Sequence, residues 1–141
     1  MLTPATRVAY ADEAGTQKTA TVQTVEADPG REIDFKDLFP EGQRVAYAFC
    51  YLNSDAEQTA HFELGSNDCA KVWINGVLAH SYWNEEGADS RPGAYAFNAE
   101  LKKGLNAILV KVEDAGGRKW EFVLEAYDAK GYPFQAHTQV P

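Results

Sequence analysis

The sequence predicts an all-β domain, a sandwich or a barrel. Short runs of aromatic and β-branched residues recur along the chain, and turns rich in Gly, Asn and Asp separate them. No helical periodicity extends beyond a turn or two, which argues against a helical or α/β fold. The clearest runs are residues 44–52, 59–64, 70–82, 93–101, 106–114 and 119–127.

The strongest local signal is the dipeptide Asn75-Gly76, because both central positions of a type I′ hairpin turn need a positive φ. A two-residue loop there pairs Ile74 with Val77, Trp73 with Leu78, Val72 with Ala79, and Lys71 with His80. Side chains alternate along a strand, so we expect one face to be core and the other to look away from it. The core face is Ala70, Val72, Ile74, Val77 and Ala79, and the opposite face is Lys71, Trp73, Leu78, His80 and Tyr82.

The same alternation assigns the remaining runs. In residues 106–114, the side chains expected to face the core are Ile108, Val110 and Val112. In residues 119–127, they are Trp120, Phe122, Leu124 and Ala126. Residues 44–52 are apolar on both faces, which predicts a central strand that is covered on both sides. Residues 32–40 contain the one predicted helical turn, ended by Pro40.

The length of 141 residues suits one domain with a single core. We expect residues 1–30 to form an N-terminal segment with an edge strand of that domain, since residues 16–25 alternate weakly. Residues 31–128 are the predicted sandwich, and residues 129–141 a C-terminal strap or linker.

Composition excludes several classes of partner. The formal net charge of −8 argues against nucleic acid and against an anionic membrane surface. No apolar run approaches the length of a membrane helix, and the first residues lack the features of a secretory signal peptide. The two cysteines cannot form a disulfide framework, and we expect a buried thiol at Cys50 and a turn thiol at Cys69, both unpaired.

Three segments together resemble the galactose-binding-like jelly-roll modules of bacterial carbohydrate-active enzymes: GSNDCAKVWING, LKKGLNAILVKVE and the terminal aromatic strand. The resemblance covers roughly residues 32–128 and implies a single two-sheet antiparallel β-sandwich. It also implies a non-catalytic carbohydrate-binding module that targets an attached enzyme to a polysaccharide or oligosaccharide. Such a module would work at a secreted or cell-surface location, as part of a larger protein with a parent enzyme domain.

The predicted sugar site combines aromatic faces, which stack on the C–H faces of sugar rings, with polar groups that hydrogen-bond to hydroxyls. The polar loop 82–93 has a length that is often functional. The packing alternative is that this loop covers Trp73 and that Trp83 anchors the loop. The candidate ligand-binding residues are Trp73, His80, Tyr82, Trp83, Asn84, Glu85, Arg91 and Tyr95.

No cofactor is required by this hypothesis, and a structural calcium ion is left open. Its candidate ligands are Asn67, Asp68 and Asp114, for which solvated turn residues are the simpler interpretation. Related lectin-type sandwiches carry Asp-Asp-Gly where this chain has Asn67-Asp68-Cys69, which weakens a calcium-bridged sugar. We predict that the chain is not an enzyme, because Glu85 and Glu86 are adjacent in a polar loop and no catalytic motif is present.

A second hypothesis belongs to a different class. In it, the chain is an accessory β-sandwich that contacts another protein or domain through the same aromatic face, without sugar. The exposure of Trp73 and Trp83 discriminates between the two.

Overall fold

The computed structural model describes residues 6–11, 14–15, 17–22, 33–35, 45–66, 69–82, 95–113 and 121–134, without the side chains of 6–11, 17–22 and 33. The chain divides into two compact units, Met1–Asp28 with Val140–Pro141, and Pro29–Gln139. The first unit holds one antiparallel hairpin, β1 (Thr6–Ala11) and β2 (Gln17–Val22). Over the described part of the chain, no helix is long and apolar enough to cross a membrane.

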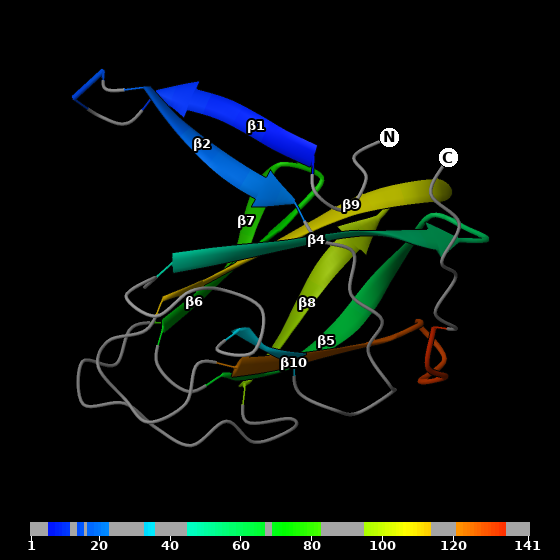
Figure 1. Cartoon of the computed structure of the whole chain (residues 1–141). Helices are drawn as coiled ribbons and strands as arrows, with labels where there is room; N and C mark the ends of the chain where they lie inside the picture. Colours follow the sequence, from blue (N-terminus) through cyan, green and yellow to red (C-terminus); the bar gives the residue numbers. More distant parts are fainter. Residues whose placement is uncertain are drawn as a thin grey trace. The chain divides into compact units, whose positions relative to one another are not determined.

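The second unit is a sandwich of two four-stranded antiparallel sheets (Figure 1). Sheet B has the order β3 (Ile33–Asp34), β10 (Glu121–Tyr127), β5 (Gln58–Ser66), β8 (Tyr95–Leu101). Sheet C has the order β4 (Val45–Ser54), β9 (Gly104–Glu113), β6 (Cys69–Ile74), β7 (Val77–Tyr82). Apart from the β6–β7 hairpin, each strand is followed by one in the other sheet, which is the strand order of a jelly roll. The predicted all-β sandwich is confirmed.

The core lies between the two sheets and follows the predicted alternation. Every second residue of β5, β6, β9 and β10 points inward, where the apolar side chains exclude water. Val77 departs from the prediction, because it lies at the tip of the β6–β7 hairpin and is exposed. The buried core cluster is Phe35, Ala46, Ala60, Phe62, Leu64, Ala70, Val72, Ile74, Leu101, Ile108, Val110, Val112 and Phe122.

The Asn75-Gly76 turn forms as predicted, with φ of 52° at Asn75 and 80° at Gly76. One fully buried amide, Asn106, ties this turn to two other segments. Its Oδ1 accepts hydrogen bonds from Asn75 Nδ2 (2.8 Å) and from the Lys102 backbone N–H (3.0 Å). Its Nδ2 donates to the carbonyl oxygens of Lys102 (2.9 Å), Gly104 (3.0 Å) and Leu52 (3.4 Å). A buried amide is tolerated because both its oxygen and its nitrogen are bonded.

The prediction of a central, doubly covered strand at 44–52 is wrong. In the described sheet β4 pairs with β9 alone, so it forms an edge of sheet C. Its inner face contributes Ala46 to the core, but its outer face is exposed. Neither cysteine forms a disulfide, as predicted, yet their exposure is reversed. Cys50 is exposed because it lies on this edge strand, whereas Cys69 begins β6 and is buried.

Two other predictions meet the structure only in part. The helical turn predicted at 32–40 is met in part: Ile33–Asp34 is a strand paired with β10, Phe35 has 3₁₀ geometry and enters the core, and residues 36–40 lie outside the described residues. In the predicted C-terminal strap, Pro133 bridges to Tyr127, and the Phe134 N–H donates to the Ala126 carbonyl (3.0 Å). The bounds 1–30, 31–128 and 129–141 stay predictions, and Trp120 lies outside the described residues.

Candidate functional site

A β-bulge in β7 divides the predicted sugar site between two faces of sheet C. The pairs Ile74–Val77 and Trp73–Leu78 form as predicted, but Val72 then pairs with His80 instead of Ala79. Ala79 is the extra residue of the bulge and has no partner on β6. Beyond it, each side chain of β7 lies on the face opposite to the one that the unbulged register predicts. The prediction that His80 and Tyr82 share an outer face with Trp73 is therefore wrong.

His80 and Tyr82 point inward instead and meet two aromatic residues of β8. The Tyr82 and Tyr95 rings are 4.2 Å apart between centroids, and His80 stacks on Phe97 at 5.2 Å with an angle of 17°. Phe97 in turn stacks on Phe62 at 5.2 Å. Sheets B and C are thus bridged by rings along the side of the sandwich where β7 and β8 form their edges.

This environment disfavours the charged form of the His80 imidazole. Burial lowers its pKa from the usual 6.5, because the charged form loses hydration among aromatic rings. Its Nε2 atom is buried with no hydrogen-bond partner, and the same is true of Ser66 Oγ. The ring cluster is therefore a packing layer that contains one polar atom, His80 Nε2, with no hydrogen-bond partner among the described residues.

Trp73 instead belongs to an apolar row that crosses the outer face of sheet C. Phe49 pairs with Leu109, Leu109 with Trp73, and Trp73 with Leu78, so one residue from each strand lines up. We call these four residues the outer row. Phe49 is 57% exposed and Leu78 is 51% exposed, while Leu109 and Trp73 are half-buried. Apolar side chains this exposed, and contiguous across a sheet, are typical of interaction surfaces.

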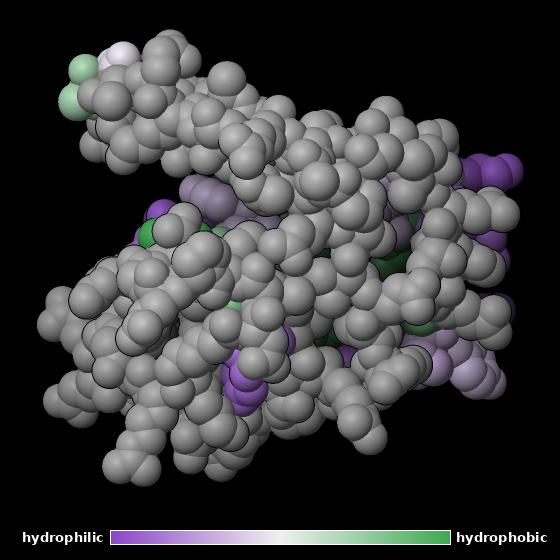
Figure 2. Space-filling model, viewed as in Figure 1, coloured by the Kyte–Doolittle hydropathy of each residue, from purple (hydrophilic) through white to green (hydrophobic). Residues whose placement is uncertain are grey.

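Exposed apolar residues extend the outer row along the sheet. Val45, Tyr47, Tyr51 and Leu105 are also exposed and lie on the same face by alternation. The Phe49 and Tyr51 rings meet edge-to-face at 5.0 Å, which holds both in place. Figure 2 shows the molecule from the same side as Figure 1. Among the described residues visible from this side, the hydrophilic areas are larger than the hydrophobic ones.

Charged groups border the outer row on one side. Next to it, Tyr47 pairs with Lys111 and Lys111 with Lys71. Lys111 Nζ lies 2.6 Å from Glu113 Oε1, so this pair is largely satisfied within the face. Lys71 is exposed.

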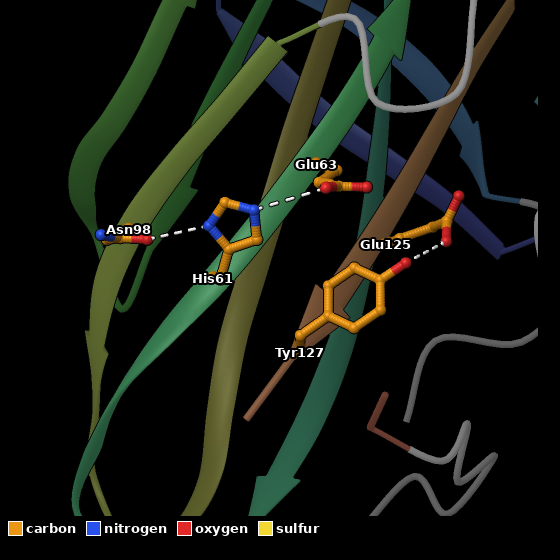
Figure 3. A network of polar contacts seen from close by, with 5 residues as sticks. All are labelled: His61, Glu63, Asn98, Glu125 and Tyr127. Carbon is orange, nitrogen blue, oxygen red and sulfur yellow. Dashed lines mark hydrogen bonds and ion pairs between the residues drawn. The ribbon is translucent and has the colours of Figure 1, made fainter. Parts of the chain in front are cut away.

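The outer face of sheet B carries a polar network instead (Figure 3). His61 Nδ1 lies 3.0 Å from Asn98 Oδ1, and His61 Nε2 lies 3.4 Å from Glu63 Oε1. Glu63 and Glu125 face each other across β5 and β10, which is unfavourable for two carboxylates. The hydroxyl of Tyr127 donates to Glu125 Oε2 (2.7 Å), so each carboxylate has a polar neighbour on its own strand.

The same network raises the pKa of Tyr127 to about 12. The hydrogen bond to Glu125 is the largest cause, followed by burial and by the negative charges of Glu125 and Glu63. A phenolate at this position would face two carboxylates, so the neutral phenol is favoured. These side chains satisfy one another, and the network is a stabilising surface of the sheet.

Several predicted site residues lie outside the described residues: Trp83, Asn84, Glu85 and Arg91 of the sugar site, and Asn67, Asp68 and Asp114 of the calcium site. Within the described part of the chain, no three His, Cys, Asp or Glu side chains come together as metal ligands. Of the predicted sugar-binding residues that are described, the structure brings together His80, Tyr82 and Tyr95, and it separates them from Trp73.

Alternation predicted that Trp73 and Leu78 of the outer row face away from the core, and the exposure of Phe49 is what it did not predict. The exposed alternation Val45, Tyr47, Phe49, Tyr51 was visible, but it was assigned to a doubly covered strand. The exposure of these residues follows from the edge position of β4, which the sheet order reveals and the sequence does not.

No protein-family model matches the chain, and no curated protein matches its sequence. A solved structure of similar fold is an anti-sigma factor domain-containing protein, with a TM-score of 0.55 and 18% identity. The match covers 86% of this chain and 40% of that one, so this chain spans well under half of that protein. At this identity the likeness concerns the fold alone. The expected membership of the galactose-binding-like carbohydrate-binding modules is wrong, because no family model and no curated protein matches and the solved structure of similar fold is an anti-sigma factor domain-containing protein.

Proposed function

We propose that the chain is a non-catalytic docking module that holds an apolar surface of another protein or domain against the outer face of sheet C. The observation that carries the proposal is the outer row, in which Phe49, Leu109, Trp73 and Leu78 line up across all four strands.

The composition of this face supports a protein partner. Aromatic residues are enriched in protein interfaces and charged residues are depleted at their centres. Here Trp73 and Phe49 alternate with the aliphatic Leu109 and Leu78, and the nearest charges, Lys71 and Lys111, lie in the neighbouring row. The half-buried Trp73 and Leu109 at the centre of the row, with the more exposed Phe49 and Leu78 at its ends, resemble the arrangement of interface hot spots.

Sugar binding stays a prediction, in a changed location. The exposed rings of Tyr47 and Phe49 offer stacking faces, but a sugar also needs several free donors and acceptors beside them. On this face Lys111 and Glu113 bind each other. The predicted platform of Trp73 with Tyr82 and Tyr95 does not exist as one surface, because the sheet lies between them.

The test is site-specific photo-crosslinking in the cells that express the chain. A photoreactive phenylalanine is placed at position 49 or 78, and at position 98 on the outer face of sheet B as the matched control. We expect the same protein adduct from 49 and 78, identified by mass spectrometry, and none from 98. Replacing Leu109 by Lys should remove this adduct, because a charge then lies at the centre of the apolar row.

A glycan array with the wild-type chain and with Phe49→Ala separates the two functions. Adducts that form equally from positions 49 and 98 would contradict the docking proposal. Glycan binding that is lost in folded Phe49→Ala would replace it with the sugar function.

A further inference from the structure

Among the described strands of the sandwich, four lie at sheet edges, and they differ in how they are protected against pairing with another strand. Natural sheets shield their edges with short strands, bulges, charges or prolines. Here β3 has two residues, β7 carries the bulge at Ala79, and β8 has Asn98 and Glu100 on its outward face. The fourth edge, β4, has ten residues, a regular register with β9 throughout, and no charged residue or proline.

The side chains of β4 add a second observation. On the outer face Tyr47 and Phe49 are each 57% exposed and Tyr51 is 38% exposed. An aromatic side chain buries about 150–250 Å² when covered, so these three rings leave roughly 300 Å² of apolar surface per copy. A long, regular and uncharged edge with exposed rings is the kind that accepts a partner strand.

We infer that β4 pairs antiparallel with β4 of a second copy of this chain, across a two-fold axis at Phe49. This interface is separate from the outer-row docking of the proposed function, although it shares Phe49. In this register Phe49 lies opposite itself and Tyr47 opposite Tyr51, so the outward pairs at the centre are aromatic.

Charge favours a second copy at this edge. A chain of net charge −8 repels its copies over most of its surface, but β4 itself carries no charge. Two copies therefore meet along β4 without bringing like charges together. Two-fold symmetric pairing is also the commonest form of self-association. The ring surface is below the ~800 Å² per partner of a standard interface, so the dimer is weak, with a Kd of about 10 µM to 1 mM.

Cys50 is a reporter for this arrangement. It is exposed on β4, whereas Cys69 is buried, so a thiol reagent reaches Cys50 first; burial of part of the thiol raises the pKa of Cys50, so the reaction is run above neutral pH. In the register centred at Phe49, the two Cys50 residues lie diagonally across the pair, with Cβ atoms roughly 7–8 Å apart. A short bis-maleimide spans this separation.

The experiment combines analytical ultracentrifugation of the full chain from about 10 µM to 1 mM with bis-maleimide crosslinking. We expect a concentration-dependent dimer, a covalent dimer that Cys50→Ser abolishes, and loss of both in Phe49→Lys, which keeps the fold because position 49 is exposed. For Phe49→Lys, whose thiol is intact, the loss of the crosslink reports the loss of pairing. The matched control is Leu78→Lys on β7, which also places a charge in the outer row but leaves the β4 edge unchanged, and it should still dimerise.

A wild-type chain that stays monomeric up to 1 mM, or a dimer that Leu78→Lys disrupts as strongly as Phe49→Lys, overturns the β4 pairing. Neither result bears on the partner adducts from position 78, so the failure of this inference is distinguishable from the failure of the proposed function.

Discussion

The two outer faces of the sandwich are built on equal numbers of strands but carry opposite chemistry. On sheet B the outward side chains bind one another, as His61 does with Asn98 and Tyr127 with Glu125. On sheet C the side chains of the outer row are apolar, so they form no such hydrogen bonds with one another. Polar side chains on a solvent face need no further explanation, whereas exposed rings cost solubility and indicate a use. This difference is the reason for proposing the outer face of sheet C as the docking face.

The largest effect on stability is expected at Asn106, whose side chain connects the β8–β9 turn with sheet C. Asn106→Ala removes five hydrogen bonds that connect the β8–β9 turn with Leu52 and Asn75, and it leaves buried backbone groups unpaired. We expect a loss of about 3–4 kcal/mol in the free energy of unfolding, measured by urea denaturation. Asn98→Ala, which removes one exposed hydrogen bond on sheet B, should cost less than about 0.5 kcal/mol. Equal losses would contradict the role of Asn106.

A pair of deletions tests the bulge that assigns residues of β7 to the two faces. Deleting Ala79 removes the unpaired residue and keeps His80 opposite Val72, so we expect a loss of about 1 kcal/mol or less. Deleting Ser81 instead turns Tyr82 to the outer face and separates it from Tyr95, which should cost about 2–3 kcal/mol. Thermal or urea unfolding of both variants decides the matter. If the Ala79 deletion is the more damaging one, the assigned register is incorrect.

The pH dependence of stability tests whether the inner side of β7 is closed to water. Because the pKa of His80 is lowered in the folded state, the unfolded chain takes up a proton first as the pH falls below 6.5. The stabilising contribution of neutral His80 is therefore complete above pH 6.5 and is lost as the pH falls towards its folded pKa. His80→Phe keeps the stacking on Phe97 and should flatten the stability profile between pH 7 and pH 5. An unchanged difference between pH 7 and pH 5 in this variant would speak against a buried His80.

The smallest effect concerns the polar face. Glu125→Gln removes the main cause of the high pKa of Tyr127, which should fall from about 12 towards the ordinary value of 10. NMR titration of the tyrosine ring carbons measures this shift. Stability at neutral pH should change little, because exposed polar pairs contribute about 0–1 kcal/mol. A Tyr127 pKa that stays near 12 would mean that Glu63 or burial, and not Glu125, dominates.

Local patterns predicted much of the fold. The Asn75-Gly76 turn, the inward positions Val110 and Val112, and the lack of a disulfide follow from turn chemistry, period-two alternation and cysteine count. The site was less accessible. A bulge adds one residue without changing composition, so nothing in the run from Val77 to Tyr82 revealed that Ala79 is skipped. An apolar strand also reads alike at the centre and at the edge of a sheet, so the exposure of Phe49 depended on the sheet order.

The buried amide of Asn106 has a consequence for motion. It is bonded to the β6–β7 turn, to the β8–β9 turn and to Leu52 of β4, so these three segments cannot open one at a time without breaking its bonds. The backbone N–H of Asn75 donates to the Ala107 carbonyl, that of Lys102 to Asn106 Oδ1, and that of Ala107 to Asn75 Oδ1. In hydrogen exchange, these three amide protons should therefore exchange as one cooperative group. The β6–β7 turn, the β8–β9 turn and the part of β4 around Leu52 then open together, in a single step.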